Sequence, residues 1–263
     1  ILSKKGDIYF QVISRDKKKL DTYVAKKGNY TPELLITEET NTYHDIYNRK
    51  QIKLINDENG NLADEDDNKR NDSIEMHKNW INASAEIGCS SARLNLYGSK
   101  NIEIWKSLSV DSLTKLGEHA KSLNINVIVE NHGGYSSNAK WLVKVIENAN
   151  RKNIGTLPDF GNFCIRSTPK NLSDWGATTS GCAVEYDRYL GVEELLPYAM
   201  SVSAKSNDFD SDGNCIETDF SRMMSIIKKS KYRGYVSIEY EGSRYSEEEG
   251  IRLTKSLLER EGV

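Results

Sequence analysis

Short apolar runs alternate with stretches of helical periodicity along the chain. Eight runs predict β-strands, at 8–13, 33–37, 51–55, 89–96, 125–131, 153–159, 200–205 and 235–240. Helices are expected between and after them, at 16–27, 40–49, 67–87, 110–123, 138–150, 216–230 and from Ser246 onwards. Such alternation favours an α/β fold with a parallel sheet, closed as a (β/α)8 TIM barrel that forms a single domain over 1–263.

The helical pattern is clearest in the second half of the chain. In 138–150, Leu142, Val145, Ile146 and Ala149 recur at i, i+3, i+4 and i+7 and form one apolar face. The last helix is expected to begin at Ser246, because Glu249 follows three residues later, as in a capping box.

Composition excludes several classes of protein. The net charge is −3, acidic and basic residues are interspersed, and charged residues make up 29% of the chain, which argues against a nucleic-acid-binding surface. No apolar run approaches 18 residues, so no membrane span is expected. The chain begins with Ile rather than Met, so a signal peptide would lie outside it, and localisation is left open between cytoplasm and export.

The four cysteines are widely scattered and include no CxxC pair, which excludes a zinc ribbon. Free thiols are the default interpretation. A bridge between Cys164 and Cys182 fits an exported protein, because both lie in the long segment 160–190. That segment is too long for a plain connection and is interpreted as a cover or specificity loop. Phe163 and Trp175 are its candidates for stacking on a sugar, with ordinary packing as the alternative.

Polar side chains stand at four consecutive strand ends, where a parallel barrel places its chemistry. The stretch VIVENHGG brings Glu130 and His132 to one side of the strand at 125–131, because residues two apart share a side. The next three strands end with Asp159 and Asn162, with Ser203 and Lys205, and with Glu239 and Glu241. Crowded carboxylates repel one another, and a divalent cation with oxygen ligands is the usual way to bring them together.

Four segments together resemble the sugar phosphate isomerase/epimerase family, the xylose isomerase-like TIM barrels: ENHGG, LPDFGNF, VSAKSNDFDSDGN and YRGYVSIEYEG. The resemblance spans roughly residues 50–263 and implies a divalent metal held by Glu130, Asp159 and Glu239. This chain has Ser203 where relatives usually carry a metal-binding His, and Asn162 where they often carry another. Losing imidazole leaves oxygen donors, so Mn or Mg is expected rather than Zn or Co, with Ser203 or water completing the shell.

The resemblance also implies a sugar isomerase or epimerase of carbohydrate metabolism. Glu130 and Glu239 would move a proton beside a carbonyl through an enediol(ate), and Lys205 would steady the developing oxyanion. Structural roles are the alternatives, with Lys205 in a buried salt bridge and Arg93 filling the barrel. The residues expected to contact a small sugar or polyol are His132, Asn162, Arg93, Asn95 and Trp175.

Two rival functions remain open. Ser203 and Asn162 also fit a carbohydrate-binding barrel that has lost catalysis, and the same enediolate serves a sugar or polyol dehydratase or lyase. A DNA-repair endonuclease is disfavoured, because only His132 among the four histidines stands at a strand end. The expected partner is therefore a small molecule, with no nucleic acid and no membrane, and a homo-oligomeric state is left open.

Overall fold

The structure is a computed structural model that describes residues 8–13, 19–26, 29–39, 50–53, 61–86, 88–167 and 181–262. For residues before 61 it describes the backbone alone. The expected helix at 40–49 lies outside these ranges, as does Trp175.

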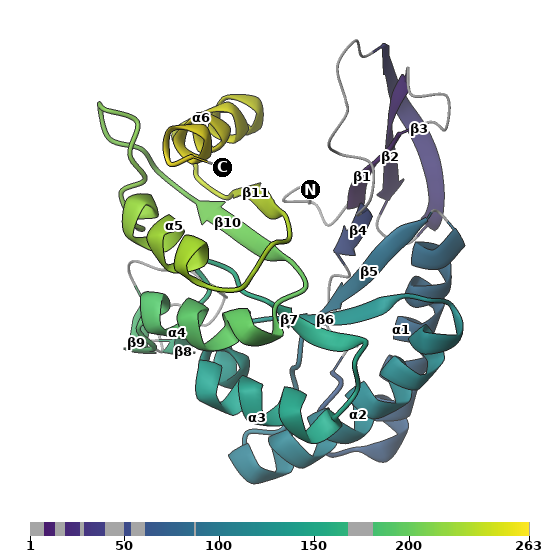
Figure 1. Ribbon diagram of the computed structural model, residues 1–263. Helices are drawn as coiled ribbons and strands as arrows, with labels where there is room; N and C mark the ends of the chain where they lie inside the picture. The colour runs from purple at the N-terminus through teal and green to yellow at the C-terminus, as the bar shows by residue number, and fades with distance from the viewer. Residues whose placement is uncertain are drawn as a thin grey trace.

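Parallel strands form the frame of the molecule. The first sheet has the order β4 (Lys50–Lys53), β5 (Cys89–Leu94), β6 (Asn126–Glu130) and β7 (Ile154–Leu157), and the second pairs β10 (Val202–Ser206) with β11 (Val236–Tyr240). Isolated parallel bridges, Thr156 with Ala199 and Asp159 with Ser203, join β7 to the β10 segment. The strands therefore follow one another in chain order as a curved parallel array (Figure 1). The pairings among described residues do not close it into a complete ring.

The N-terminal segment differs from the expectation. Strands β1 (Ile8–Ile13), β2 (Lys19–Lys26) and β3 (Asn29–Glu39) form an antiparallel sheet in that order. The prediction that 8–13 and 33–37 are successive parallel barrel strands separated by a helix at 16–27 is therefore wrong. Only two residues separate β2 from β3, a spacing that suits a hairpin and is far too short for a parallel crossover.

Helices follow the parallel strands and cover the outside of the array (Figure 1). They are α1 (Asp67–Glu86), α2 (Ile102–Ser122), α3 (Ala139–Ala149), α4 (Arg188–Leu195), α5 (Phe220–Lys229) and α6 (Glu247–Arg260), with 3₁₀ turns η1 (Gly134–Ser137) and η3 (Leu196–Tyr198). Helix α2 begins earlier than expected, because Asn101 accepts hydrogen bonds from the backbone N–H groups of Glu103 and Ile104. The capping box of Ser246 and Glu249 is confirmed at α6.

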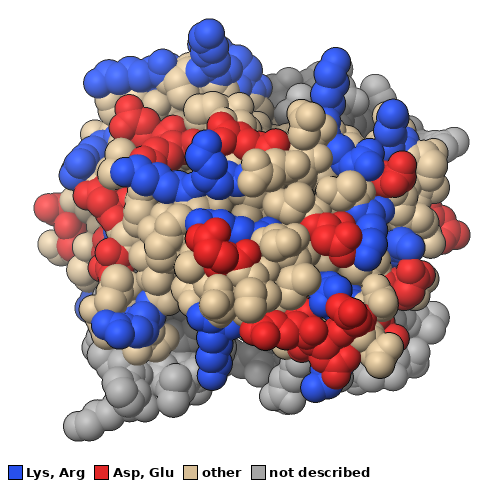
Figure 2. Space-filling model, turned by 90° about the horizontal axis from the view of Figure 1, so that it is seen from below, with Lys and Arg blue, Asp and Glu red and all other residues tan. Residues whose placement is uncertain are grey.

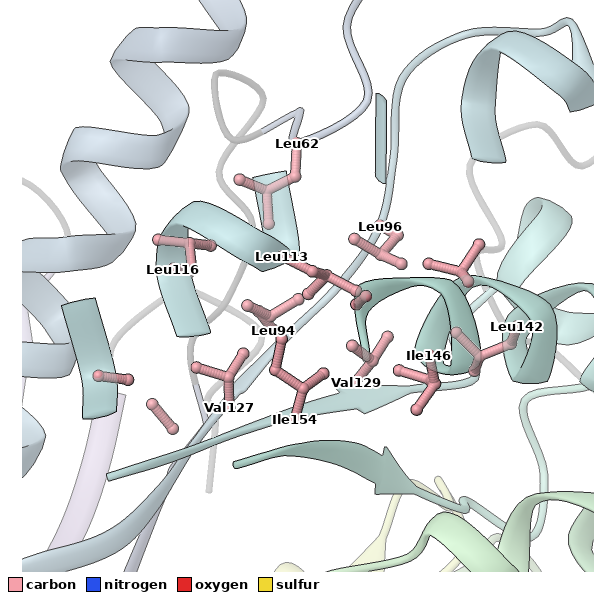
Figure 3. Close-up of a cluster of buried hydrophobic side chains, with 14 of the residues drawn as sticks. Leu62, Leu94, Leu96, Leu113, Leu116, Val127, Val129, Leu142, Ile146 and Ile154 are labelled. Carbon is pink, nitrogen blue, oxygen red and sulfur yellow. The ribbon is translucent and has the colours of Figure 1, made fainter. Parts of the chain in front are cut away.

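Two apolar cores lie between the strands and the helices. In the first, Leu94, Val127 and Val129 of the sheet pack with Leu113 and Leu116 of α2 (Figure 3). In the second, the β10 residues Val202 and Ala204 cluster with residues from α5 and α6, namely Phe220, Met223, Met224, Ile227, Leu257 and Leu258. These apolar side chains thus hold the helices against the strands, whereas polar side chains lie at the strand ends.

The segment 160–190 contains a strand pair that the sequence did not reveal: β8 (Cys164–Ser167) and β9 (Cys182–Glu185) pair antiparallel. A disulfide joins Cys164 to Cys182 with their Cα atoms 5.7 Å apart, which is the bridge that the sequence left open as the alternative to free thiols. Phe163 is fully buried against Gly191, where an added Cβ would lie 2.2 Å from its ring. Phe163 is therefore a packing residue rather than a sugar-stacking one.

None of the helices in the described ranges combines the length and the apolar character needed to cross a membrane.

Candidate active site

Three carboxylates meet at the carboxyl ends of the parallel strands. Glu130 ends β6, Asp159 follows β7, and Glu239 lies near the end of β11. Each offers one oxygen, and these oxygens all lie within 4.8 Å of one another. Glu130 and Asp159 are almost completely buried, whereas the side chain of Glu239 keeps 17% of its exposure. The sequence placed these three groups at strand ends, and the structure brings them together.

Asp159 has two unlike oxygens. Its Oδ1 accepts hydrogen bonds from the backbone N–H groups of Gly161 (2.8 Å) and Asn162 (3.0 Å). No donor among the described residues contacts its Oδ2, although that atom is buried. Burial raises the pKa of Asp159 far above its usual value, Glu239 and Glu130 raise it further, and Lys205 opposes them. A buried acceptor without a donor suits either a proton or a metal ion.

Glu130 is held on both oxygens. Arg93, from the adjacent strand β5, forms an ion pair with Oε2, and the Asn162 side-chain amide donates to Oε1 at 2.8 Å. Arg93 and Glu130 are 2% and 1% exposed, so the pair is shielded from water. Arg93 was expected either to bind substrate or to fill the barrel. In the structure it is the counter-ion of Glu130.

Lys205, in β10, is buried among acceptors. Its ammonium donates to Asn162 Oδ1 (2.9 Å) and lies 2.6 Å from Glu241 and 3.8 Å from Glu239. Burial by itself lowers the pKa of Lys205, but the nearby carboxylates outweigh burial and raise the pKa above its usual value. Lys205 is therefore a cation at the site. It forms the buried salt bridge that the sequence analysis gave as its alternative role.

Ser203 occupies the position where relatives usually carry His. Its hydroxyl donates to Oε2 of Glu239 at 2.7 Å, because Ser203 lies on β10 beside the paired strand β11. Asn162, at the other departure from the family pattern, uses its amide oxygen on Lys205 and its amide nitrogen on Glu130. Both residues thus hydrogen-bond to charged side chains of the site.

Asn95, Tyr97 and His132 form a hydrogen-bonded group near Arg93 and Glu130, in which Asn95 is buried and the other two are partly exposed. The Tyr97 hydroxyl donates to the backbone carbonyl of His132 (2.9 Å) and contacts Nδ1 of the same ring, while the amide of Asn95 lies 3.5 Å from that hydroxyl. Burial raises the pKa of Tyr97, so its hydroxyl stays neutral.

Sequence reasoning missed two residues of this network. Tyr97 continues the alternation of Arg93 and Asn95 beyond the end of β5, and that parity was the available signal. Asn131 gave no signal, yet its fully buried amide accepts from the N–H of Asp159 (2.7 Å) and donates to the carbonyls of Asp159 and Asn162.

The donor set fits a divalent cation. Glu130, Asp159 and Glu239 supply three carboxylates within reach of one centre, and Oδ2 of Asp159 has no hydrogen bond from the described residues. When Asp159 is ionised, four carboxylates including Glu241 face the cations of Arg93 and Lys205 in the described network. Carboxylate oxygens gathered in this way suit a hard divalent ion.

The fold and the cluster place the chain in a family. Residues 28–260 match the family model of the xylose isomerase-like TIM barrel, and the chain belongs to that family. The predicted (β/α)8 fold class and the resemblance are thereby confirmed.

Solved structures support the same fold. An L-ribulose 3-epimerase superposes with a TM-score of 0.61 at 15% identity, covering 80% of this chain and 74% of that one. The IOLI protein with a bound zinc atom gives 0.57 at 15% identity, with 76% and 73% covered. A xylose isomerase-like protein from Mycobacterium smegmatis in complex with magnesium gives 0.50 at 16%, with 79% and 73% covered. No curated protein matches the sequence.

Proposed function

We propose that this protein is a divalent-metal-dependent sugar isomerase or epimerase that removes a proton beside a carbonyl. The observation that carries the proposal is the triad of Glu130, Asp159 and Glu239, two of them buried, with an Asp159 oxygen that no described donor contacts. The match to a family whose structural neighbours include an L-ribulose 3-epimerase adds support for the sugar class.

The triad would hold the cation. A bound divalent ion supplies polarisation of the substrate carbonyl and hydroxyl, which acidifies the neighbouring C–H. Oxygen-only ligands favour Mn or Mg over Zn or Co. The neighbours that contain magnesium and zinc support a divalent ion without distinguishing among these.

Residues of the chain itself transfer the proton, stabilise the negative charge and contact the substrate. Glu239 accepts the carbon-bound proton, and Ser203 orients it through the hydrogen bond to Oε2. Lys205 stabilises negative charge on the substrate oxygen, because its ammonium is buried and stays protonated. The partly exposed Tyr97 and His132 are candidates to contact sugar hydroxyls.

A small sugar or polyol is the expected substrate. On the face shown in Figure 2, basic and acidic side chains are interspersed, which gives no support to a nucleic-acid surface. A dehydratase or lyase would use the same proton removal. A binding protein without catalysis is the second candidate, favoured by Ser203 and Asn162, which are committed to Glu239 and to the Lys205–Glu130 network.

Exchange of substrate hydrogen with solvent tests the proposal before the natural substrate is known. The protein with Mn or Mg is incubated in D₂O with a panel of keto- and aldo-sugars, and NMR follows loss of the proton beside the carbonyl. Glu239→Gln is expected to slow exchange about 100-fold or more, the usual effect of losing a general base. Sugar and metal binding without exchange across the panel would favour the binding protein.

A further inference from the structure

A disulfide lies close in sequence to a residue of the candidate active site. Cys164, the first residue of β8, follows Asn162 by two positions, and its partner is Cys182, the first residue of β9. Asn162 is fully buried and connects two charged groups of the site, because its amide nitrogen donates to Glu130 (2.8 Å) and its amide oxygen accepts from Lys205 (2.9 Å). The covalent link and the site therefore share one short segment of backbone.

The strands that the disulfide joins bury little surface of their own. Each has four residues, and Cys164 is the only buried residue among them. Their pairing also shifts register on both sides of Arg166. A pair of strands is marginally stable in water unless it buries an apolar face, whereas a disulfide limits the freedom of the opened segment. The bridge is therefore a principal link between β8 and β9.

The chain after β9 contacts the residue next to Asn162. The N–H of Tyr186 donates to the carbonyl of Phe163 at 2.9 Å. The chain then enters α4, where Gly191 lies against the buried ring of Phe163. Phe163 is thus held by this part of the chain through its backbone and through its side chain, and it is bonded directly to Asn162. Release of β9 would loosen both contacts.

The two sulfur atoms of the bridge differ in their access to solvent. Cys164 is buried, whereas Cys182 is partly exposed and begins a strand whose other three residues are exposed. A thiolate in solution therefore reaches the Cys182 sulfur more readily. Cys89 and Cys215 are the free cysteines, and both are buried, so neither offers an accessible thiol to the bridge.

We propose that the Cys164–Cys182 disulfide is a redox-sensitive clamp on Asn162, and that its reduction loosens the carboxylate site and weakens binding of a divalent cation. This inference rests on the proposed function and adds regulation of the same site. The agent that acts on the clamp is a dithiol, either a small molecule or a protein with two neighbouring thiols.

The exchange balances in atoms and electrons. A thiolate of the dithiol attacks the Cys182 sulfur, the bond between the two cysteine sulfurs breaks, and Cys164 leaves as a thiolate that takes up a proton. The second thiol of the reductant loses its proton and attacks the mixed disulfide, and Cys182 leaves as a thiolate that takes up a proton. The reductant ends as a cyclic disulfide, so two electrons pass from it to the protein.

Manganese titration of the oxidised and the reduced protein tests the clamp. The bridge is reduced with a dithiol, the dithiol is removed without admitting air, and affinity is measured at a temperature where circular dichroism shows both forms folded. Reduction is expected to weaken Mn binding about 10-fold, the usual cost of losing a group that orients a ligand. The double variant Cys164→Ser, Cys182→Ser should bind like the reduced protein, with or without dithiol treatment. Oxidised protein in enough urea to lower its unfolding free energy equally is the control for general loosening and should keep its Mn affinity.

Asn162→Ala tests whether the effect passes through Asn162. Reduction should change the Mn affinity of this variant by less than about 2-fold, because the group through which the bridge acts is gone. An undiminished effect of reduction in the variant would overturn the inference. Equal Mn affinity of the oxidised and reduced wild-type protein would also overturn it and would leave the proposed function standing.

Hydrogen exchange tests the clamp without a metal. The N–H of Phe160 donates to the carbonyl of Ser203, and those of Gly161 and Asn162 donate to Asp159. These three amides are expected to exchange at least about 10-fold faster after reduction, beyond any change in the urea control. If the oxidised protein binds no Mn, the proposed function fails, and these exchange rates still decide whether the bridge clamps Asn162. Rates that do not change on reduction would refute the clamp.

Discussion

Asn131 is expected to determine the geometry of the metal-binding carboxylates through hydrogen bonds to the backbone. Its amide makes three hydrogen bonds to the chain after β7, accepting from the N–H of Asp159 and donating to the carbonyls of Asp159 and Asn162. Replacing Asn131 with Leu keeps the size of the side chain and removes all three bonds. The variant introduces no charge, so an effect on cation binding reflects position rather than electrostatics.

The expected loss of stability follows from what is left without a partner. The carbonyl of Asn162 keeps the hydroxyl of Ser137 at 2.7 Å, whereas the N–H and carbonyl of Asp159 lose their Asn131 partner in a fully buried place. Each buried unsatisfied group costs about 1–3 kcal/mol, so the free energy of unfolding should fall by about 3 kcal/mol. For a chain of this length the melting temperature should fall by roughly 6–12 °C.

Mn titration at a temperature where the variant is folded supplies the decisive measurement. Displacing Asp159 should weaken Mn binding by about 10- to 100-fold, the usual cost of losing a group that orients a ligand. Asn153→Leu is the matched control. The amide of Asn153 also donates to two carbonyls, those of Gly117 (2.8 Å) and Ile125 (3.4 Å), but at the opposite end of β7. It should lower stability and leave Mn affinity unchanged.

Wild-type Mn affinity in folded Asn131→Leu protein would refute this reasoning, as would a change in melting temperature below about 3 °C. An equal loss of Mn affinity in the Asn153 variant would show that general loosening, not placement of Asp159, is responsible.

Four further outcomes are expected. Burial raises the pKa of Asp159 from 3.8 to about 8, so in metal-free protein its contribution to stability is full below pH 3.8 and is lost as pH rises through 8; melting curves of Asp159→Asn should lack that fall. Ser203→His should shift the metal preference in titrations towards Zn, Co or Ni, because an imidazole joins the carboxylates. Replacing Cys164 and Cys182 with Ser should lower the unfolding free energy by about 3 kcal/mol. A reductant should lower the unfolding free energy of the wild-type protein by the same amount and leave that of the double variant unchanged. Lys205→Met should slow hydrogen exchange in the sugar panel about 100-fold, since the oxyanion loses its cation, and unchanged exchange would assign Lys205 a structural role.

The sequence determined what local periodicity and side-chain parity control. The apolar faces of α3 and α5, the capping box of α6 and the succession of parallel strands all follow from spacings of two, three and four residues. Because carboxyl ends of parallel strands meet at one edge, the same spacings also brought Glu130, Asp159 and Glu239 to one place.

Only the tertiary structure decided the partners within the site. Arg93 and Glu130 are separated by 37 positions, and Asn162 and Lys205 by 43, so their pairing depends on how neighbouring strands align. The same limit applies at the N-terminus, where a helix was expected over 16–27 but β2 (Lys19–Lys26) pairs with a β-strand on each side. Strand pairing and buried ion pairs are non-local interactions, and the chain's own periodicity does not contain them.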